Sequence, residues 1–303
     1  MLRAGRVRRG AGAGRMYPTR SDPAGTQPAQ RGVPVDSYLW LAAIGLFAGL
    51  VGGLLGIGGS IIMIPAMNEL FGLNQHLHQG AALIVNFFVA VPAVYQHTRA
   101  KAIVWSVVRA MAPGAVVAVL VGVGVSELPV FAARNQGYLV LVFAGFMVCV
   151  AAADFHKMLC RDGGERPSAA ADNPIWKAAL LVGLPTGFVS GLLGVGGGVV
   201  MVPLQRRVLH MPLRQAIANS ATTIIALSLV GAASKNYALI AEGLDPWWSA
   251  IAMAAVLIPT AMIGAFCGGK LTHTLPVGQV RLAFILLLLA FAIRMTLRAV
   301  GTL

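Results

Sequence analysis

Two glycine-rich stretches carry the pattern in this sequence that is best suited to binding chemistry. Residues 49–65 read GLVGGLLGIGGSIIMIP and residues 187–203 read GFVSGLLGVGGGVVMVP, with ten of the 17 positions identical. Glycine costs about 1 kcal/mol relative to alanine inside a helix, so clustered glycines in an apolar run predict a break in a helix. The backbone N–H groups at such a break, at the positive end of the next helix, can hold an anion.

Small polar side chains on the following segments could add donors to the same site. Ser220 and Thr223 are three residues apart and share a helical face, and Asn86 follows the first glycine stretch. Two alternatives stay open, because glycines also let membrane helices pack closely and hydroxyls also bond to their own helix. Lys235 could attract anions or only extend to the membrane interface. The predicted substrate-binding residues are Gly56, Gly58, Gly59, Ser60, Asn86, Gly194, Gly196, Gly197, Gly198, Asn219, Ser220, Thr222, Thr223 and Lys235.

The composition indicates an integral membrane protein. Hydrophobic residues make up 57% of the 303 residues and charged residues only 11%, whereas soluble domains average about 25% charged residues. So little charge cannot cover the surface of a soluble monomer. We expect no enzyme activity, because no Ser/His pair, metal cluster or paired carboxylates lies at depth in a span. We also expect no cofactor and no metal site, since His76, His78 and His97 are weak candidates for ligands.

The apolar segments predict an all-α polytopic membrane protein with about eight transmembrane helices. Helices are expected because backbone groups in lipid must be bonded within their own segment. The expected segments are 38–66, 80–96, 104–125, 137–156, 175–203, 215–234, 247–268 and 277–297. The predicted division is a tail at 1–37, a first transmembrane repeat at 38–156, a hydrophilic linker at 157–174 and a second transmembrane repeat at 175–303.

The two halves are interpreted as an internal repeat, a feature of many transporters that bind substrate where the repeats meet. Residues 67–79 hold Glu69 and no Lys or Arg, whereas the matching 204–214 hold Arg206, Arg207 and Arg214. Opposite charge on matching loops favours inverted topology by the positive-inside bias. Four crossings per half would instead leave the halves parallel, so inversion requires one re-entrant or split segment in each half.

The N-terminal tail explains much of the net charge of +13. It contains the seven arginines Arg3, Arg6, Arg8, Arg9, Arg15, Arg20 and Arg31. We expect a disordered cytoplasmic tail that obeys the positive-inside bias, and no nucleic-acid partner. We expect the protein in the cytoplasmic (inner) membrane, with its N-terminus in the cytoplasm. Its expected partners are the lipid bilayer and a small anionic substrate, and whether it forms a homo-oligomer stays open.

The chain resembles the sulfite exporter TauE/SafE family of membrane permeases. The resemblance rests on the duplicated Gly-Leu-Leu-Gly stretch with its downstream proline, on 218–222 (ANSAT) and on Lys235, and it covers roughly 38–298. The first copy departs from the pattern at Ser60 and where 83–86 (LIVN) replaces the hydroxyl-rich stretch. The resemblance implies a permease for sulfite, a sulfonate or a related sulfur anion.

The sequence therefore predicts a secondary transporter, expected to be an exporter, of a small sulfur-containing anion. The alternatives are a passive small-anion channel and a non-transporting membrane accessory protein. A bound anion or an aqueous cavity at the two breaks would distinguish transport from a role in packing alone.

Overall fold

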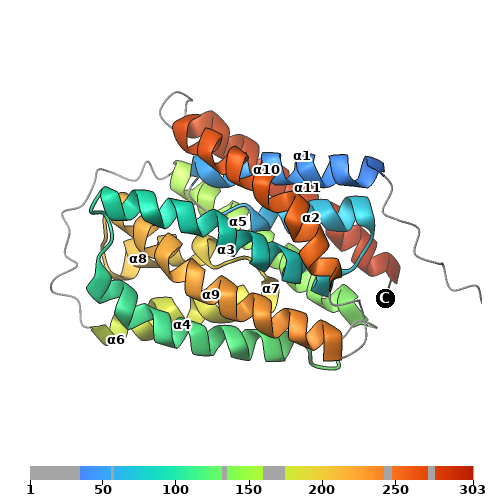
Figure 1. Ribbon diagram of the computed structural model, residues 1–303, viewed down its shortest axis with the longest axis horizontal. Coiled ribbons are helices and arrows are strands. Elements are labelled where there is room, and N and C mark those ends of the chain that lie inside the picture. The colour runs from blue at the N-terminus through green and yellow to red at the C-terminus, as the bar shows by residue number, and fades with distance from the viewer. Residues whose placement is uncertain are drawn as a thin grey trace, which may run out of the picture. The chain divides into compact units, whose positions relative to one another are not determined.

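The computed structural model describes residues 35–55, 58–131, 135–159, 175–241, 248–271 and 277–302. These residues form helices and contain no strand, which confirms the predicted all-α fold (Figure 1). Most of the predicted tail and linker, and Gly56, lie outside the described residues. Within them, the first helix already begins at Val35 and the helix before the linker continues to Leu159.

Eleven α-helices and one π-helix are present in the described part of the chain. The first half contains α1 (Val35–Leu55), α2 (Ser60–Phe71), α3 (Gln75–Arg99), α4 (Trp105–Ser126) and α5 (Gln136–Leu159). The second half contains α6 (Ile175–Lys177), the π-helix η2 (Ala178–Gly183), α7 (Leu184–Leu193), α8 (Gly198–Val208), α9 (Leu213–Ala241), α10 (Ser249–Leu271) and α11 (Val277–Thr302).

Seven of these helices are long and apolar enough to cross a membrane, namely α1, α3, α4, α5, α9, α10 and α11. This confirms a polytopic membrane protein. The remaining predicted span, 175–203, does not form one uninterrupted helix. Its residues are divided between the apolar stretch Ala178–Leu193 and α8, with a break between them.

Glycines bring two pairs of helices into backbone contact. On α1, a Cβ added to Gly49 would collide with the backbone of Ala261 on α10. On α7, a Cβ added to Gly187 would collide with the backbone of Ala115 on α4. In the first helix pair, Gly45, Gly49 and Gly53 lie in turn against Leu257, Ala261 and Ala265. In the second pair, Gly183, Gly187 and Gly191 lie in turn against Met111, Ala115 and Val119. In each pair the residue numbers of the contacting residues rise in the same direction along both helices, so the two helices run parallel.

After each break the chain folds back along the helix that precedes it. Gly59 lies against the backbone of Ala48, and an added Cβ on Gly52 would meet the Gly59 nitrogen. In the same way, Gly197 lies beside Thr186 and Ser190. The short helices α2 and α8 therefore return towards the end from which α1 and α7 started.

The long helices α3 and α9 pack against each other and run antiparallel. Gly80 near the start of α3 lies against Asn236 near the end of α9. At the other end, Asn219 Oδ1 near the start of α9 accepts a hydrogen bond at 2.8 Å from Val104 N, which follows α3. We call these two ends of the bundle the Lys235 end and the Arg214 end, because Arg214 donates to Ala100 O there.

The loops that carry opposite charge in the sequence lie at opposite ends. Glu69 and the end of α2 lie at the Lys235 end, whereas Arg214 and the start of α9 lie at the Arg214 end. In each half, a helix and the short helix that folds back along it start and finish at the same end of the bundle, and three crossing helices follow. Each half therefore finishes at the end opposite to the one where it started. The antiparallel α3 and α9 fit that arrangement, and the two inverted repeats stay a prediction.

Candidate functional site

The break between α7 and α8 contains three glycines in the left-handed region. Their φ angles are 73° at Gly194, 70° at Gly196 and 86° at Gly197. Side chains with a Cβ rarely adopt such angles, so the glycines explain why the helix ends here. The first bonds of α8 run from Val200 N and Met201 N to Gly197 O. The backbone N–H groups before them therefore have no partner within α8 and lie at the positive end of its dipole.

Beside Gly194, the acceptor Gln79 Oε1 has no hydrogen-bond partner among the described residues, and three donors beside the break also have none. The three donors are Asn86 at its Nδ2, Thr186 at its Oγ1 and Ser190 at its Oγ. An ideal Cβ on Gly196 would lie 2.5 Å from Asn86 Nδ2, and one on Gly197 would lie 2.8 Å from Thr186 Cγ2 and 3.9 Å from Ser190 Cβ. Thr186 and Ser190 are fully buried, and Asn86 is 8% exposed.

Burying a hydrogen-bond donor without a partner destabilises the folded protein. Each buried polar group without a partner costs about 1–3 kcal/mol. Native structures keep few of them, and each requires an explanation. The three unpaired donors beside the break are therefore candidates for binding a small hydrogen-bond acceptor.

The first break contacts the second. Ser60, the first residue of α2, donates from its Oγ to Val195 O at 2.8 Å across 135 positions of sequence. Gly58 has a φ of 89° and no atom within 4 Å of an added Cβ, whereas Gly59 has an ordinary helical φ of −82°. The two breaks are therefore neighbours in space, and the first has open space around Gly58.

The predicted residues on α9 divide into two groups. Asn219 accepts from Val104 N and donates to Gln205 Oε1 at 3.2 Å, so its amide ties α8 and the loop before α4 to α9. Thr222 and Thr223 donate to the carbonyl oxygens of Ala218 and Asn219 in their own helix. Ser220 is 2% exposed and its Oγ has no partner among the described residues. Of these four, Ser220 retains an unused donor.

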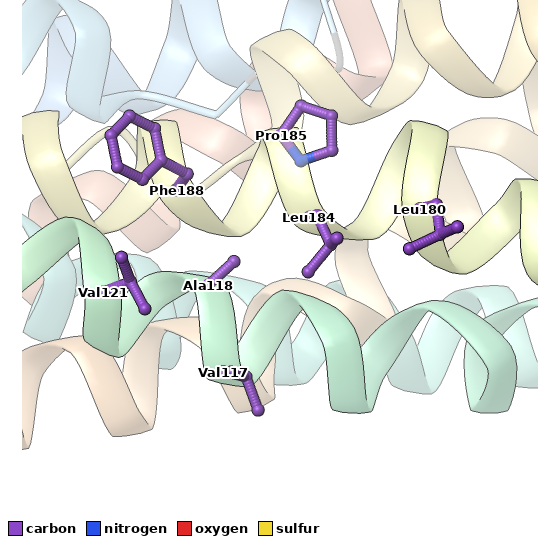
Figure 2. A pocket seen from close by; sticks show the side chains of 7 residues that line it. All are labelled: Val117, Ala118, Val121, Leu180, Leu184, Pro185 and Phe188. Carbon is purple, nitrogen blue, oxygen red and sulfur yellow. The ribbon is translucent and has the colours of Figure 1, made fainter.

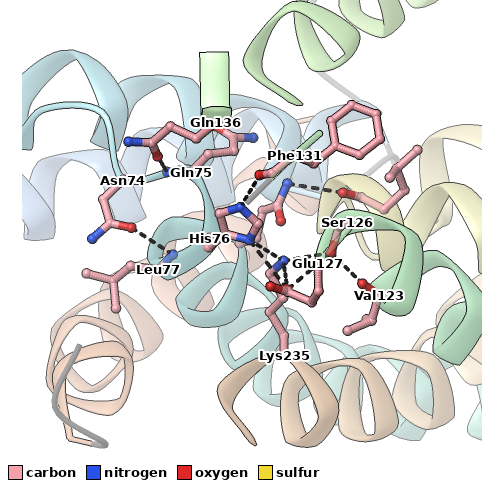
Figure 3. A network of polar contacts seen from close by, with 12 residues as sticks. Asn74, Gln75, His76, Leu77, Val123, Ser126, Glu127, Phe131, Gln136 and Lys235 are labelled. Atoms are coloured by element: carbon pink, nitrogen blue, oxygen red, sulfur yellow. Dashed lines mark hydrogen bonds and ion pairs between the residues drawn. The ribbon is translucent and has the colours of Figure 1, made fainter. Parts of the chain in front are cut away.

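Lys235 lies inside α9 rather than after it, and its side chain is fully buried. Its Nζ lies 2.7 Å from His76 Nδ1, 2.8 Å from Ser126 Oγ and 2.5 Å from Glu127 Oε1 (Figure 3). A position at the membrane interface, where lysines extend to water, does not describe this residue. The structure instead pairs the ammonium group with a carboxylate just beyond the end of α4.

Glu127 is the member of this cluster that reaches solvent, with 16% of its side chain exposed. Burial raises the pKa of its carboxyl group. The hydrogen bond to His76 and the charge and hydrogen bond of Lys235 lower it more, and the net pKa is about 2. The carboxylate therefore stays ionised throughout the physiological pH range.

Sequence reasoning missed several residues that the structure brings to these sites. Thr186 and Ser190 were not singled out, although hydroxyl residues four positions apart on one helical face directly before the break were a visible signal. His76 was considered only as a weak metal candidate. The structure places its Nε2 2.8 Å from Phe131 O, and His78 Nδ1 lies 2.7 Å from Asn68 Oδ1. No cluster of potential metal ligands occurs in the described residues.

An apolar depression on the surface between α4 and the η2–α7 segment does not contribute to an anion site (Figure 2). It has a volume of about 430 Å³ and is lined by Val117, Ala118, Val121, Leu180, Leu184, Pro185 and Phe188. None of these side chains offers a hydrogen-bond donor. The depression is a surface that lipid chains can fill.

Comparison with known proteins identifies the group to which the chain is related. The family model described as sulfite exporter TauE/SafE matches residues 41–295. The probable membrane transporter protein MamO of Magnetospirillum gryphiswaldense is 29% identical over 293 residues, covering 87% of this chain and 45% of MamO. The probable membrane transporter protein YunE of Bacillus subtilis is 27% identical over 252 residues, covering 78% of this chain and 87% of YunE.

A third relative, a probable membrane transporter protein of Haemophilus influenzae, is 27% identical over 268 residues, covering 84% of this chain and 96% of that protein. The chain spans about half the length of the two MamO proteins that it matches, with 45% of each covered. No solved structure matches the chain significantly.

Proposed function

Because the chain belongs to the sulfite exporter TauE/SafE family and is a membrane transporter by that relationship, we propose that it carries a small sulfur-containing anion across the cytoplasmic membrane. Sulfite, a sulfonate such as sulfoacetate, or thiosulfate are the proposed substrates, and export is the proposed direction. The proposed binding site is the break between α7 and α8.

The observation that carries this proposal is the group of unpaired buried donors at Asn86, Thr186 and Ser190. An oxyanion of sulfur presents three oxygens around one centre, so several N–H and O–H donors can bind it at once. The free N–H groups at the start of α8 would complete the set. No cationic side chain is required, because the helix dipole and the aligned amides supply the positive potential.

The buried position of the site is consistent with alternating access. The break residues 194–198 are buried, and so are the unpaired donors around them. An anion could reach them only after the bundle opens towards one side. Since α7 and α8 lie on either side of the break, a movement of α8 relative to α7 would expose the glycines.

The distribution of charge indicates which end faces the cytoplasm. Arg99, Lys101, Arg206, Arg207 and Arg214 lie around the described loops at the Arg214 end. The Lys235 end carries Glu69 and Glu127 together with Arg294 and Arg298. By the positive-inside bias, we infer that the Arg214 end is cytoplasmic. The first residues of α1 would then lie on the opposite side, unlike the orientation expected from the arginines of the tail.

Purified protein in liposomes tests the proposal. Uptake of radiolabelled sulfite, thiosulfate, sulfoacetate and isethionate would be measured with unlabelled anion trapped inside, and with sulfate and chloride as competitors. We expect saturable uptake of at least one sulfur anion that is accelerated by the trapped anion, since exchange is a property of carriers. Flux that rises linearly with concentration and shows no acceleration would instead indicate a passive channel. Uptake equal to that of empty liposomes for every anion would overturn the proposal.

The site is tested by two substitutions that alter its donors but not its size. Ser190→Ala and Thr186→Val each remove one unpaired hydroxyl. Because the hydroxyls have no partner among the described residues, we expect thermal stability to be unchanged or slightly raised, and the KM for the anion to rise about tenfold, equivalent to about 1.4 kcal/mol. Unchanged transport by both variants would place the substrate elsewhere.

A further inference from the structure

Gln79 on α3 places an unpaired acceptor beside the candidate anion site. Its Nε2 donates to Leu192 O at 3.2 Å. A carbonyl oxygen can only accept, so this contact determines which end of the side-chain amide carries the NH2 group. Gln79 is fully buried, and its Oε1 has no hydrogen-bond partner in the described part of the chain. Turning the amide would place a donor there instead, but only at the expense of the bond to Leu192.

This acceptor and the unpaired donors lie along one glycine break in a fixed order. Gln79 Cβ lies 2.8 Å from an added Cβ on Gly194, and Asn86 Nδ2 lies 2.5 Å from one on Gly196. The two side chains are seven residues apart on one face of α3, or about 10 Å along its axis. The Cα atoms of the two glycines are at most about 7 Å apart. The acceptor therefore lies beside Gly194, and the donors lie beside Gly196 and Gly197.

The immediate surroundings of the break are uncharged. The heavy atoms nearest to an added Cβ on Gly194, Gly196 and Gly197 belong to Gln79, Asn86, Thr186, Leu227 and Ser190. The start of α8 contributes about half a positive charge. A buried charge without a compensating partner is costly, and a second negative charge on the guest would have no such partner among these side chains. The site therefore suits a monoanion better than a dianion such as thiosulfate.

The Oε1 atom of Gln79 distinguishes oxygens that carry a hydrogen from oxygens that do not. It can accept a hydrogen bond from a hydroxyl group, but it repels an anionic oxygen at the same distance because both atoms present lone pairs. A guest without a hydroxyl leaves Oε1 buried and unpaired, which costs free energy. Sites that bind a substrate hydroxyl reject analogues that lack it for the same reason.

We propose that the break between α7 and α8 selects sulfur monoanions that carry a hydroxyl group, and that Gln79 recognises this hydroxyl. This inference rests on the proposed function and narrows its substrate class. The anionic oxygens bind the donors near Gly196 and Gly197, and the hydroxyl donates to Gln79 Oε1 near Gly194. Isethionate, with its hydroxyl on carbon, and hydrogensulfite, with its hydroxyl on sulfur, share this chemistry.

Isethionate and ethanesulfonate provide the decisive comparison. They differ only by the hydroxyl group, and neither changes its charge near neutral pH. Uptake of each labelled anion would be measured in proteoliposomes over a range of concentrations. We expect the KM of wild type to be at least tenfold lower for isethionate, equivalent to about 1.4 kcal/mol, because ethanesulfonate leaves Gln79 Oε1 without a partner.

Two substitutions remove the acceptor in different ways. Gln79→Met removes both ends of the amide, whereas Gln79→Lys keeps a donor for Leu192 O but has no acceptor. We expect the preference for isethionate over ethanesulfonate to fall below threefold in both variants. A purely structural defect would raise both KM values by the same factor and leave their ratio unchanged. The matched control is Gln96→Met, at an exposed glutamine of the same helix, and it should keep the preference of wild type.

Inhibition of isethionate uptake by sulfite distinguishes the two sources of the hydroxyl. Sulfite is mainly hydrogensulfite at pH 6 and mainly a dianion at pH 8. We expect the inhibition constant of wild type for sulfite to fall at least fivefold from pH 8 to pH 6, while that for ethanesulfonate stays constant. An inhibition constant for sulfite that does not change would overturn the proposal for hydrogensulfite and support it for a hydroxyl on carbon alone.

The remaining outcomes separate this inference from the proposed function. Equal KM values for isethionate and ethanesulfonate in wild type, or uptake of thiosulfate without uptake of isethionate, would overturn the selection of a hydroxyl and leave the proposed transport intact. A preference that survives in both Gln79→Met and Gln79→Lys would overturn the role of Gln79. If neither variant folds, the ratio of KM values in wild type decides whether the site selects a hydroxyl. Absence of uptake for every anion in wild type overturns the proposed function and this inference together.

Discussion

The two glycine breaks have closely similar sequences, but their surroundings differ. The break at 194–198 is buried throughout, and side chains of α3 press against two of its glycines. At the break before α2, Gly58 and Gly59 are half-buried, and an added Cβ on Gly58 would meet nothing within 4 Å. The two similar stretches thus differ, because the second is enclosed beside unpaired donors whereas the first has open space at Gly58.

Side chains of helix α3 enclose the second break. The α3 helix brings Gln79 and Asn86 to Gly194 and Gly196. The stretch on α9 that matches α3 in the repeat contains Thr222 and Thr223, whose hydroxyls bond to their own helix. The two stretches therefore share their glycine pattern but not the polar side chains around it. We infer that the two breaks have unequal roles in binding, and the following predictions test that inequality.

The largest effect is expected for Gly196→Ala. The left-handed φ of 70° costs a residue with a Cβ about 1–2 kcal/mol, and the new methyl group would lie 2.5 Å from Asn86 Nδ2. We expect anion uptake to fall at least thirtyfold. The comparison variant is Gly58→Ala, which has the same conformational cost but open space around it, and we expect its uptake to fall about threefold. Uptake in proteoliposomes measures both.

An equal loss in the two variants would contradict the unequal roles of the breaks. The amount of folded protein must be determined for each variant by its thermal transition, so that uptake is expressed per folded molecule. A greater loss for Gly58→Ala than for Gly196→Ala would move the proposed site to the first break.

The second prediction concerns the part of the molecule where the halves are alike. Gly49→Ala and Gly187→Ala each place a methyl group against a backbone carbonyl, that of Ala261 and that of Ala115. Overpacking of this kind costs about 1–3 kcal/mol. We expect both variants to lower the thermal transition, and by similar amounts, in detergent. A large loss for one and none for the other would contradict equivalent packing of the two helix pairs.

The third prediction separates a binding residue from a structural one by using the same substitution. Asn86→Ala removes a donor that has no partner among the described residues, so we expect no loss of thermal stability and a KM about tenfold higher, or about 1.4 kcal/mol. Asn219→Ala leaves Val104 N without its acceptor and should cost about 1–3 kcal/mol in stability. Its KM per folded molecule should change less. The opposite pattern would assign the substrate to α9.

Sequence reasoning went furthest where a single physical constraint determined the answer. Backbone groups in lipid must be bonded, and this constraint led from composition to helices that the structure confirms. Glycine at Gly194, Gly196 and Gly197 is needed for positive φ, so the local backbone was readable from residue type. The number of spans was less certain, because the segment 175–203 is apolar throughout although its helix is interrupted.

The remaining features depend on contacts between distant parts of the chain. Nothing near Lys235 in the sequence indicates that His76, 159 positions away, and Glu127, 108 positions away, lie beside it. In the same way, Asn219 and Ser220 are adjacent polar residues, and only packing determines that one is paired and the other is not. Sequence identifies which residues can donate hydrogen bonds, but the paired state of each depends on the tertiary structure.

The smallest effect is expected at the contact that joins the two breaks. Ser60→Ala removes the hydrogen bond from Ser60 Oγ to Val195 O, a loss of about 0.5–1.5 kcal/mol. Because Val195 lies between Gly194 and Gly196, a freed carbonyl should loosen the second break, and we expect the KM to rise about threefold with a slightly lower thermal transition. Thr222→Val is the control, since its hydroxyl bonds only within α9, and we expect its KM to change less than twofold. If Ser60→Ala also left the KM unchanged, the two breaks would act independently, and the first would contribute to packing alone.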